Sequence, residues 1–163
     1  MIKTGLVAIC LLLFQKPPET GIIAGTLALP PGGHAGSRPA RVVLLSEQLT
    51  NIWNGDLQRR LDAYWERYKP AFAQNKEYFL EVSRLAQRES FNYILARMRR
   101  DDPEIIASCV KEIQPGGKFE FRNVAFGDYK ILAMGAVGNQ DFVWQDDVQV
   151  KSSIPQFLEL KNH

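Results

Sequence analysis

The alternation of hydrophobic and polar positions is clearest between residues 116 and 137, where it predicts two β-strands around a tight turn. Phe119 and Phe121 alternate with charged residues, which is the period-two pattern of a strand with one buried face. Gly127 begins the turn, and Tyr129 begins a second strand whose two faces are both mostly apolar. A strand that is apolar on both faces belongs in the middle of a sheet. We therefore expect a hairpin that the flanking segments extend into a larger sheet.

Short apolar segments on both sides of this hairpin predict further strands, at residues 21–29, 40–47, 141–151 and 155–161. In the third of these segments, Asp146 shares the parity of the apolar residues. An unpaired carboxylate that faces a core is costly, so we predict a bulge or a strand end near Asp146.

Between about residues 51 and 114 the apolar period changes from two to 3.6, which predicts three amphipathic helices. The first helix has an apolar stripe that consists of Leu57, Leu61, Tyr64, Trp65 and Tyr68. We expect Pro70 to end or kink this helix. The third helix should begin at Asp102 and Pro103, because Asp caps helices and Pro suits the first helical position. Its apolar stripe continues to Ile113. We therefore predict one domain at residues 21–163 that is mainly β, with a helical insertion at 47–114.

The segments GIIAGTLALPPGG, ARVVLLS, GGKFEFRNVAFGDYKILA, VQV and FLEL, in this order, resemble the carboxypeptidase regulatory-like domain. This resemblance covers about residues 20–46 and 115–161 and implies a prealbumin-like antiparallel β-sandwich, also called transthyretin-like or carbohydrate-binding-like. Such domains are accessory modules of secreted or surface proteins, and some relatives bind glycans. The resemblance carries no catalytic residue. It assigns structural roles to Phe119, Phe121, Gly127 and Tyr129, and together with the shared parity of Tyr129 and Ile131 it predicts a Tyr129 ring buried between two sheets.

Composition adds little to this picture. The chain has 163 residues, of which 45% are hydrophobic and 23% charged, as in an ordinary soluble domain. Its formal charge of +2 is too small to favour a nucleic-acid partner.

The first residues predict a signal segment at 1–20, because Lys3 precedes an apolar run that ends at Phe14. This run is about half of the ~20 residues that a spanning helix needs, so we expect no stable transmembrane anchor. Cys10 would suit a lipoprotein, but the bulky Ile9 stands where lipidation requires a small residue. We therefore predict a secreted or periplasmic protein.

No motif in the sequence predicts catalysis, a cofactor or a metal site. The two histidines are His34, in a loop rich in Gly and Pro, and His163. Cys109 lies in the apolar stripe of the third helix, where a small core residue is the simpler interpretation than a nucleophile. We predict that the protein is not an enzyme, and an unrecognised hydrolase is the least favoured alternative.

The preferred function is a non-catalytic module that acts through protein contacts, with a carbohydrate-binding module as the alternative. Trp65 and Trp144 share the parity of apolar stripes and are expected to be buried, whereas Trp53 precedes its stripe and stands beside polar residues. We therefore expect Trp53 to be exposed and name it as the candidate ligand-binding residue. The partner would be a protein or an envelope glycan, and the oligomeric state stays open. We expect the helical insertion to supply the contact surface, with an arginine rim made of Arg59, Arg60, Arg97, Arg99 and Arg100.

Overall fold

The computed structural model describes residues 19–29, 39–114, 116–138 and 140–161. The expected signal segment, apart from its last two residues, lies outside this range, as do Cys10, His34 and His163. The described chain forms the strands β1 (Thr20–Leu27), β2 (Ala40–Ser46), β3 (Val110–Ile113), β4 (Lys118–Ala125), β5 (Gly127–Val137), β6 (Gln140–Val150) and β7 (Gln156–Leu160). Its helices are α1 (Glu47–Gln74), α2 (Lys76–Asp101) and α3 (Pro103–Cys109).

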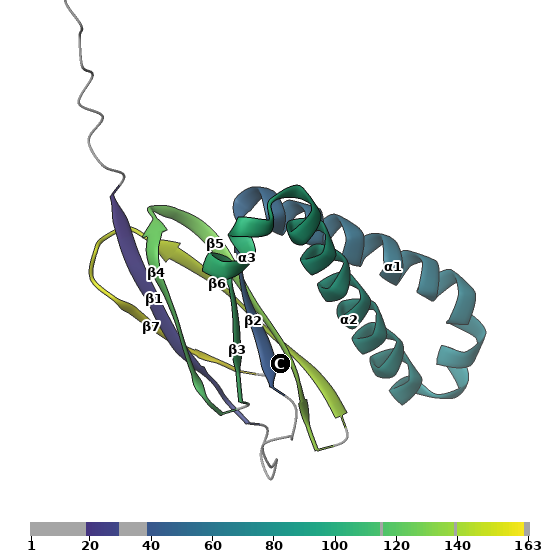
Figure 1. The fold of residues 1–163 in the computed structure, drawn as a ribbon. Coiled ribbons are helices and arrows are strands. Elements are labelled where there is room, and N and C mark those ends of the chain that lie inside the picture. Colours follow the sequence, from purple (N-terminus) through teal and green to yellow (C-terminus); the bar gives the residue numbers. More distant parts are fainter. Residues whose placement is uncertain (1–18, 30–38, 115, 139, 162–163) are drawn as a thin grey trace, which may run out of the picture.

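The strands form two sheets that face each other (Figure 1). Sheet A has the order β4-β1-β7, and sheet B has the order β3-β2-β5-β6. Neighbouring strands are antiparallel except β1 and β7, which run parallel from the pair Ile23 and Gln156 to the pair Leu27 and Leu160. The predicted fold class, a mainly β sandwich interrupted by helices, is confirmed. The central position predicted for β5 is also correct, because this strand lies between β2 and β6.

The predicted hairpin between β4 and β5 is wrong, because these consecutive strands belong to different sheets. β4 ends at Ala125 in sheet A, and β5 begins at Gly127 in sheet B, so the chain crosses from one sheet to the other at Phe126. Alternation along a strand shows which residues face a core, but a hairpin and a crossover produce the same alternation. The crossover lets both strands face one shared core.

The shared core between the sheets contains Phe119 and Phe121, both of which are buried as expected. Gly25 on β1 leaves room for one of these rings, since a Cβ atom there would lie 2.5 Å from Cζ of Phe119. Trp144 is also buried, and its Nε1 donates a hydrogen bond of 3.0 Å to the carbonyl oxygen of Ala28. Aromatic rings from both sheets therefore fill the sandwich.

Tyr129 is half-buried, not enclosed between the sheets as expected. It pairs with Ser46 and Val148 near one end of sheet B, where α1 begins, so the ring contacts the core from its border. Its hydroxyl donates a hydrogen bond of 3.0 Å to the carbonyl oxygen of Ala125, and burial raises the pKa of this hydroxyl.

The bulge or strand end predicted near Asp146 is wrong, because β6 continues to Val150 and pairs with β5 without a shift from Gly127 and Val150 to Val137 and Gln140. β6 is an edge strand of sheet B, and the Asp146 side chain is exposed there. The carboxylate accepts a hydrogen bond of 2.9 Å from the backbone N–H of Asp147. An exposed edge position removes the cost that motivated the prediction.

The helices form a third layer on the outer face of sheet B, and the two long helices form a hairpin that extends beyond the strands (Figure 1). A second apolar cluster joins them to this sheet, and its members are Val43, Leu45, Trp53, Phe91, Ile94, Leu95, Met98 and Leu132. α1 continues through Pro70 to Gln74, so of the two outcomes expected at Pro70, an end or a kink, the end is wrong. A proline removes only one backbone N–H donor, and here the helix is continuous on both sides of it.

The third helix begins as predicted but ends earlier. The Asp102 side chain accepts hydrogen bonds of 3.1 and 3.3 Å from the N–H groups of Glu104 and Ile105, as a capping residue does. The helix ends at Cys109, and the next four residues form β3, which pairs with β2 from Ala40 to Val43. The helical part of the insertion is therefore 47–109. Apolar residues near the end of the predicted stripe fit a short strand as well as a helix, and pairing with β2 decides between them.

Candidate functional site

The three tryptophans differ in exposure, and the expectation for two of them is wrong. Trp53 is only 2% exposed, because α1 starts directly after β2 and its first turns lie against sheet B. The Nζ atom of Lys130 lies 5.9 Å from the centre of the Trp53 ring. Trp65, which shares the predicted apolar stripe, is 44% exposed. The structure therefore removes Trp53 as a ligand-binding candidate and presents Trp65 in its place.

Trp65 belongs to a group of rings at the end of the helical hairpin, which we call the distal aromatic cluster. Its members are Tyr64, Trp65, Tyr68 and Phe72 of α1 with Tyr78 and Phe79 of α2. Phe72 lies at its centre, with ring centres 5.5 Å from Trp65 and 5.4 Å from Phe79. The rings meet because α1 places aromatic residues three or four positions apart and α2 returns alongside it.

One side of this cluster is open to solvent. Phe79 is 43% exposed, and its ring meets that of Trp65, so the exposed parts of the two rings lie together. Aromatic side chains are enriched in the centres of protein interfaces, and grouped exposed apolar residues mark interaction surfaces. The distal aromatic cluster can therefore offer an apolar surface to a partner.

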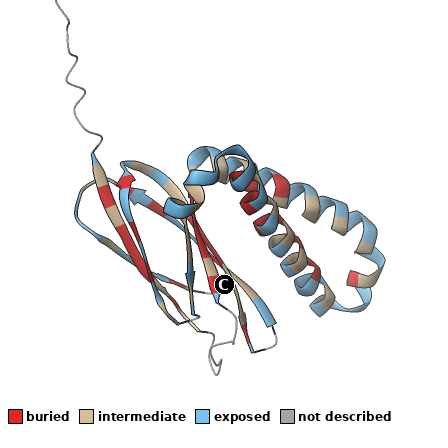
Figure 2. Ribbon diagram, viewed as in Figure 1, coloured by how far each residue is buried: buried red, intermediate tan, exposed pale blue. Residues whose placement is uncertain are grey.

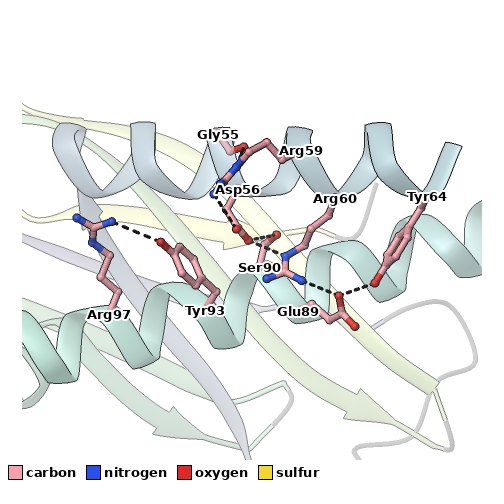
Figure 3. A network of polar contacts seen from close by, with 9 residues as sticks. All are labelled: Gly55, Asp56, Arg59, Arg60, Tyr64, Glu89, Ser90, Tyr93 and Arg97. Carbon is pink, nitrogen blue, oxygen red and sulfur yellow. Dashed lines mark hydrogen bonds and ion pairs between the residues drawn. The ribbon is translucent and has the colours of Figure 1, made fainter. Parts of the chain in front are cut away.

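A polar network holds the two long helices together beside this cluster (Figure 3). Asp56 of α1 is only 5% exposed, and it accepts hydrogen bonds from Arg59 at 3.1 Å and Arg60 at 2.7 Å on its own helix. It also accepts one of 2.9 Å from Ser90 of α2, which is fully buried. Because a buried carboxylate needs such partners, these bonds fix the position of α1 against α2.

Glu89 extends the network toward the distal aromatic cluster. It accepts a hydrogen bond of 2.8 Å from Arg60 and another of 2.6 Å from the hydroxyl of Tyr64. The bond to Glu89 raises the pKa of Tyr64, because the carboxylate favours the protonated phenol. In both helices the network lies between the residues that pack on sheet B and the rings at the far end. It thus orients one ring of the cluster directly.

Sequence reasoning missed this network. The available signal is Asp56, a charged residue between the apolar Trp53 and Leu57 with Arg60 four positions later. Such spacing is also typical of a surface ion pair on a helix. Only the approach of α2 shows that the carboxylate is buried.

The expected arginine rim does not form around the exposed rings. Arg59 and Arg60 take part in the polar network, and Arg97, Arg99 and Arg100 lie at the other end of α2 from Phe79. Arg97 and Arg100 bind the carboxylate of Asp101 at 3.1 and 2.9 Å. Four of the five guanidinium groups therefore bind side chains of the two helices, and the five do not form a ring of charge around the cluster.

In the part of the chain that the structure describes, no three side chains of His, Cys, Asp or Glu lie close enough together to hold a metal ion. Cys109 is half-buried and packs against both apolar clusters. No helix of the described residues combines the length and apolar character needed to cross a membrane.

Comparisons of the chain with family models, with curated proteins and with solved structures find no match. The fold and the surfaces described above are therefore the basis for any functional proposal.

Proposed function

We propose that this protein is a non-catalytic module that binds another protein through its distal aromatic cluster. The observation that carries the proposal is the joint exposure of Trp65 and Phe79 on a cluster whose central ring, Phe72, is buried. A surface of this kind is preorganised, so a partner would gain apolar contact at little cost in side-chain ordering. The polar network supports this, because it holds the two helices at a fixed position.

Glycan binding is the second candidate, and the exposed Trp65 favours it. A sugar ring stacks on a flat aromatic face. Here Phe72 stacks against Trp65 with an angle of 30° between the ring planes, and Phe79 meets Trp65 edge-on at 85°. These two rings cover part of the Trp65 ring, and the exposed apolar patch is not one flat face. Such a patch fits a protein side chain better than it fits a sugar ring.

We further propose that the module acts outside the cytoplasm. The basic Lys3 and the apolar run to Phe14 support this location, as they do in secretory signals. The measurement is the mass of the protein from a fractionated native source. Recovery with Met1 intact from the cytosolic fraction would contradict the proposal.

The binding function can be tested by photo-crosslinking in cells that make the full chain. Trp65→p-benzoylphenylalanine should yield a crosslinked protein, because the ring at this position would lie in the interface. Ile154→p-benzoylphenylalanine is the matched control, since Ile154 is an exposed apolar residue outside the hairpin. We expect no crosslink to the same protein from this position.

A glycan partner would give a different result. No protein would be crosslinked at position 65, and a polysaccharide would change the intrinsic fluorescence of the wild type. This change should be absent from Trp65→Phe, because Trp53 and Trp144 are buried. That outcome would overturn protein binding in favour of the carbohydrate-binding alternative.

A further inference from the structure

The edge strand β6 exposes backbone groups that no other strand satisfies, since among the described strands it pairs only with β5. In antiparallel pairing, residues that bond to the neighbouring strand alternate with residues whose N–H and C=O point away from it. Two bonds identify the second set. The carbonyl oxygen of Gln149 accepts from Nε2 of Gln156 at 2.6 Å, and the N–H of Asp147 donates to its neighbour Asp146. Because the register has no shift, the backbone N–H and C=O groups of all odd-numbered residues of β6 point away from β5.

This edge has two halves. In the half that contains Asp147 and Gln149, side chains form hydrogen bonds with backbone groups that point away from β5. Such bonds protect the edge of a sheet from pairing with another strand. In the other half, the outward groups of Asp141, Val143 and Gln145 have no hydrogen-bond partner among the described residues. We call this second half the open edge. It is a template to which another extended chain can bind.

A hollow of about 150 Å³ lies beside the open edge. α2 lines it with Leu80, Ser83, Arg84 and Gln87, which share one face of the helix, and β6 lines it with Phe142, Val143 and Gln145. Successive residues of a strand point to opposite faces of a sheet, so a hollow that touches Phe142 and Val143 together must lie at the strand's edge. Lys161, which follows β7, completes it.

The hollow is positively charged. Arg84 and Lys161 line it, and no carboxylate does. Arg84 lies with its guanidinium carbon 5.9 Å from the centre of the Phe142 ring and forms no ion pair among the described residues, whereas the nearby Arg88 is paired with Asp141 at 3.0 Å. Lys161 contacts Glu159 at 3.3 Å, an exposed pair of the kind that contributes little. Arg84 also lines an adjoining hollow with Glu81 and Asp141, and Asp141 is already paired with Arg88. An incoming carboxylate would therefore meet a guanidinium group that has no ion-pair partner among the described residues.

We propose that the open edge binds an extended segment of another protein as an added β-strand, with an acidic side chain of that segment in the hollow beside Arg84. The volume suits one side chain and is below the ~300 Å³ at which pockets for drug-sized ligands begin. This surface is separate from the distal aromatic cluster and does not depend on the function proposed for that cluster.

A second copy of this chain is a poorer occupant. β6 itself carries three acidic residues, Asp141, Asp146 and Asp147, and no basic one. Pairing two β6 strands would bring these six carboxylates to one seam, where like charges oppose association. The charge of the hollow thus favours a different chain.

The probes for a test are two fluorescein-labelled nine-residue peptides of alternating threonine and valine, one with a central glutamate and one with a central lysine. Fluorescence anisotropy with the full chain should show at least tenfold tighter binding of the glutamate peptide. Arg84→Glu should abolish this preference. Arg99→Glu is the matched control, because Arg99 is exposed on the same helix roughly 22 Å along its axis. It should leave both affinities unchanged.

A second pair of variants tests strand addition itself. Val143→Pro removes an outward N–H that takes no part in pairing with β5, so the sheet should remain while peptide affinity falls at least tenfold. Gln149→Pro changes a residue of the same parity in the protected half and should have no effect. Hydrogen exchange of the wild type supplies a readout that needs no variant. The amides of Val143 and Gln145 should exchange fast in the free protein and become protected with the glutamate peptide.

Several results would overturn the proposal. These are failure of the glutamate peptide to bind, binding without protection of the Val143 and Gln145 amides, and binding that Arg84→Glu leaves unchanged. A dimer of the free protein that Val143→Pro dissociates would assign the edge to a second copy. A substitution in the distal aromatic cluster, Phe79→Ser, should leave peptide affinity unchanged, which separates this surface from the one proposed above.

Discussion

The two halves of the helical hairpin have similar apolar stripes but different surroundings. In the half near the strands, Trp53 and Phe91 are buried against Leu132 of sheet B. In the far half, Trp65 and Phe79 pack on other rings and remain partly exposed. Figure 2 shows the same contrast, with buried positions along the part of α2 that faces the sheet and exposed positions common at the far end. A stripe thus shows which face of a helix is apolar, while the neighbouring sheet decides whether that face is covered.

The polar network marks the border between these halves. Asp56 and Ser90 are the buried polar residues of the described chain, and both belong to it. A hydrogen-bonded carboxylate specifies one alignment of two helices, whereas apolar contacts tolerate sliding. The far half can therefore stay exposed and still be well ordered.

The largest expected effect contrasts a buried ring with an exposed ring on α2. Phe91→Ala should lower the free energy of unfolding by about 3–5 kcal/mol, because it leaves a cavity between α2 and sheet B. Phe79→Ala should cost about 1 kcal/mol or less, since the Phe79 ring is partly in water already. Urea denaturation of both variants provides the measurement. Equal losses would show that the far half is as well packed as the near half.

The second effect concerns the polar network at the border between the two halves of the hairpin. Asp56→Ala removes the acceptor for Arg59, Arg60 and Ser90, and we expect a loss of about 2–3 kcal/mol in the free energy of unfolding. Asp62→Ala is the control on the same helix, because Asp62 is exposed and, among the described residues, forms a hydrogen bond only with Gln58. Its effect should stay within about 0.5 kcal/mol. A similar loss in both variants would contradict a special role for the buried carboxylate.

A third and smaller effect sharpens the role of Glu89. Tyr64→Phe deletes one hydrogen bond and should cost about 0.5–1.5 kcal/mol at neutral pH. Because the folded-state pKa of Tyr64 is raised above the ordinary value of 10.0, the bond stabilises the fold fully below pH 10.0. This contribution is lost as the pH rises through the folded-state pKa, so the difference between wild type and variant should shrink there. A difference that grows with pH would refute the bond to Glu89.

The smallest effect on stability is expected for Trp65→Phe, which should change the free energy of unfolding by less than about 0.5 kcal/mol. The same variant should lose most of the tryptophan fluorescence that iodide quenches, because Trp53 and Trp144 are buried. Stern–Volmer plots of wild type and variant provide the check. Unchanged quenching would place the exposed tryptophan elsewhere.

The sequence predicts the layers of this fold better than their connections. The apolar character of both faces of β5 was enough to place that strand inside a sheet, and Asp102 with Pro103 was enough to predict the start of α3. Both signals are local, since each depends on the chemistry of a few adjacent residues. The crossover at Phe126 is not determined by adjacent residues, because it depends on the distant strands with which β4 and β5 pair.

The candidate site was predicted less well for the same reason. The stripe that contains Trp65 was correctly identified as apolar, but its exposure depends on how far α1 extends past sheet B. Trp53 stands beside polar residues in the sequence, yet the strand before it directs its helix onto the sheet. β3 was missed because Val110 and Ile113 fit the helical period. This segment forms a strand because it pairs with β2 on the side opposite to β5.

The parallel pairing of β1 with β7 has a consequence for folding kinetics. Sheet B and the helical hairpin are assembled from residues 40–150, so their contacts can form before β7 has been synthesised. Sheet A cannot be completed until residues 156–160 reach β1, more than a hundred positions earlier in the chain. Such distant contacts are slow to form because a long loop must close first. The docking of β7 is therefore expected to be the last step of folding, and until then one side of β1 stays available to competing strands.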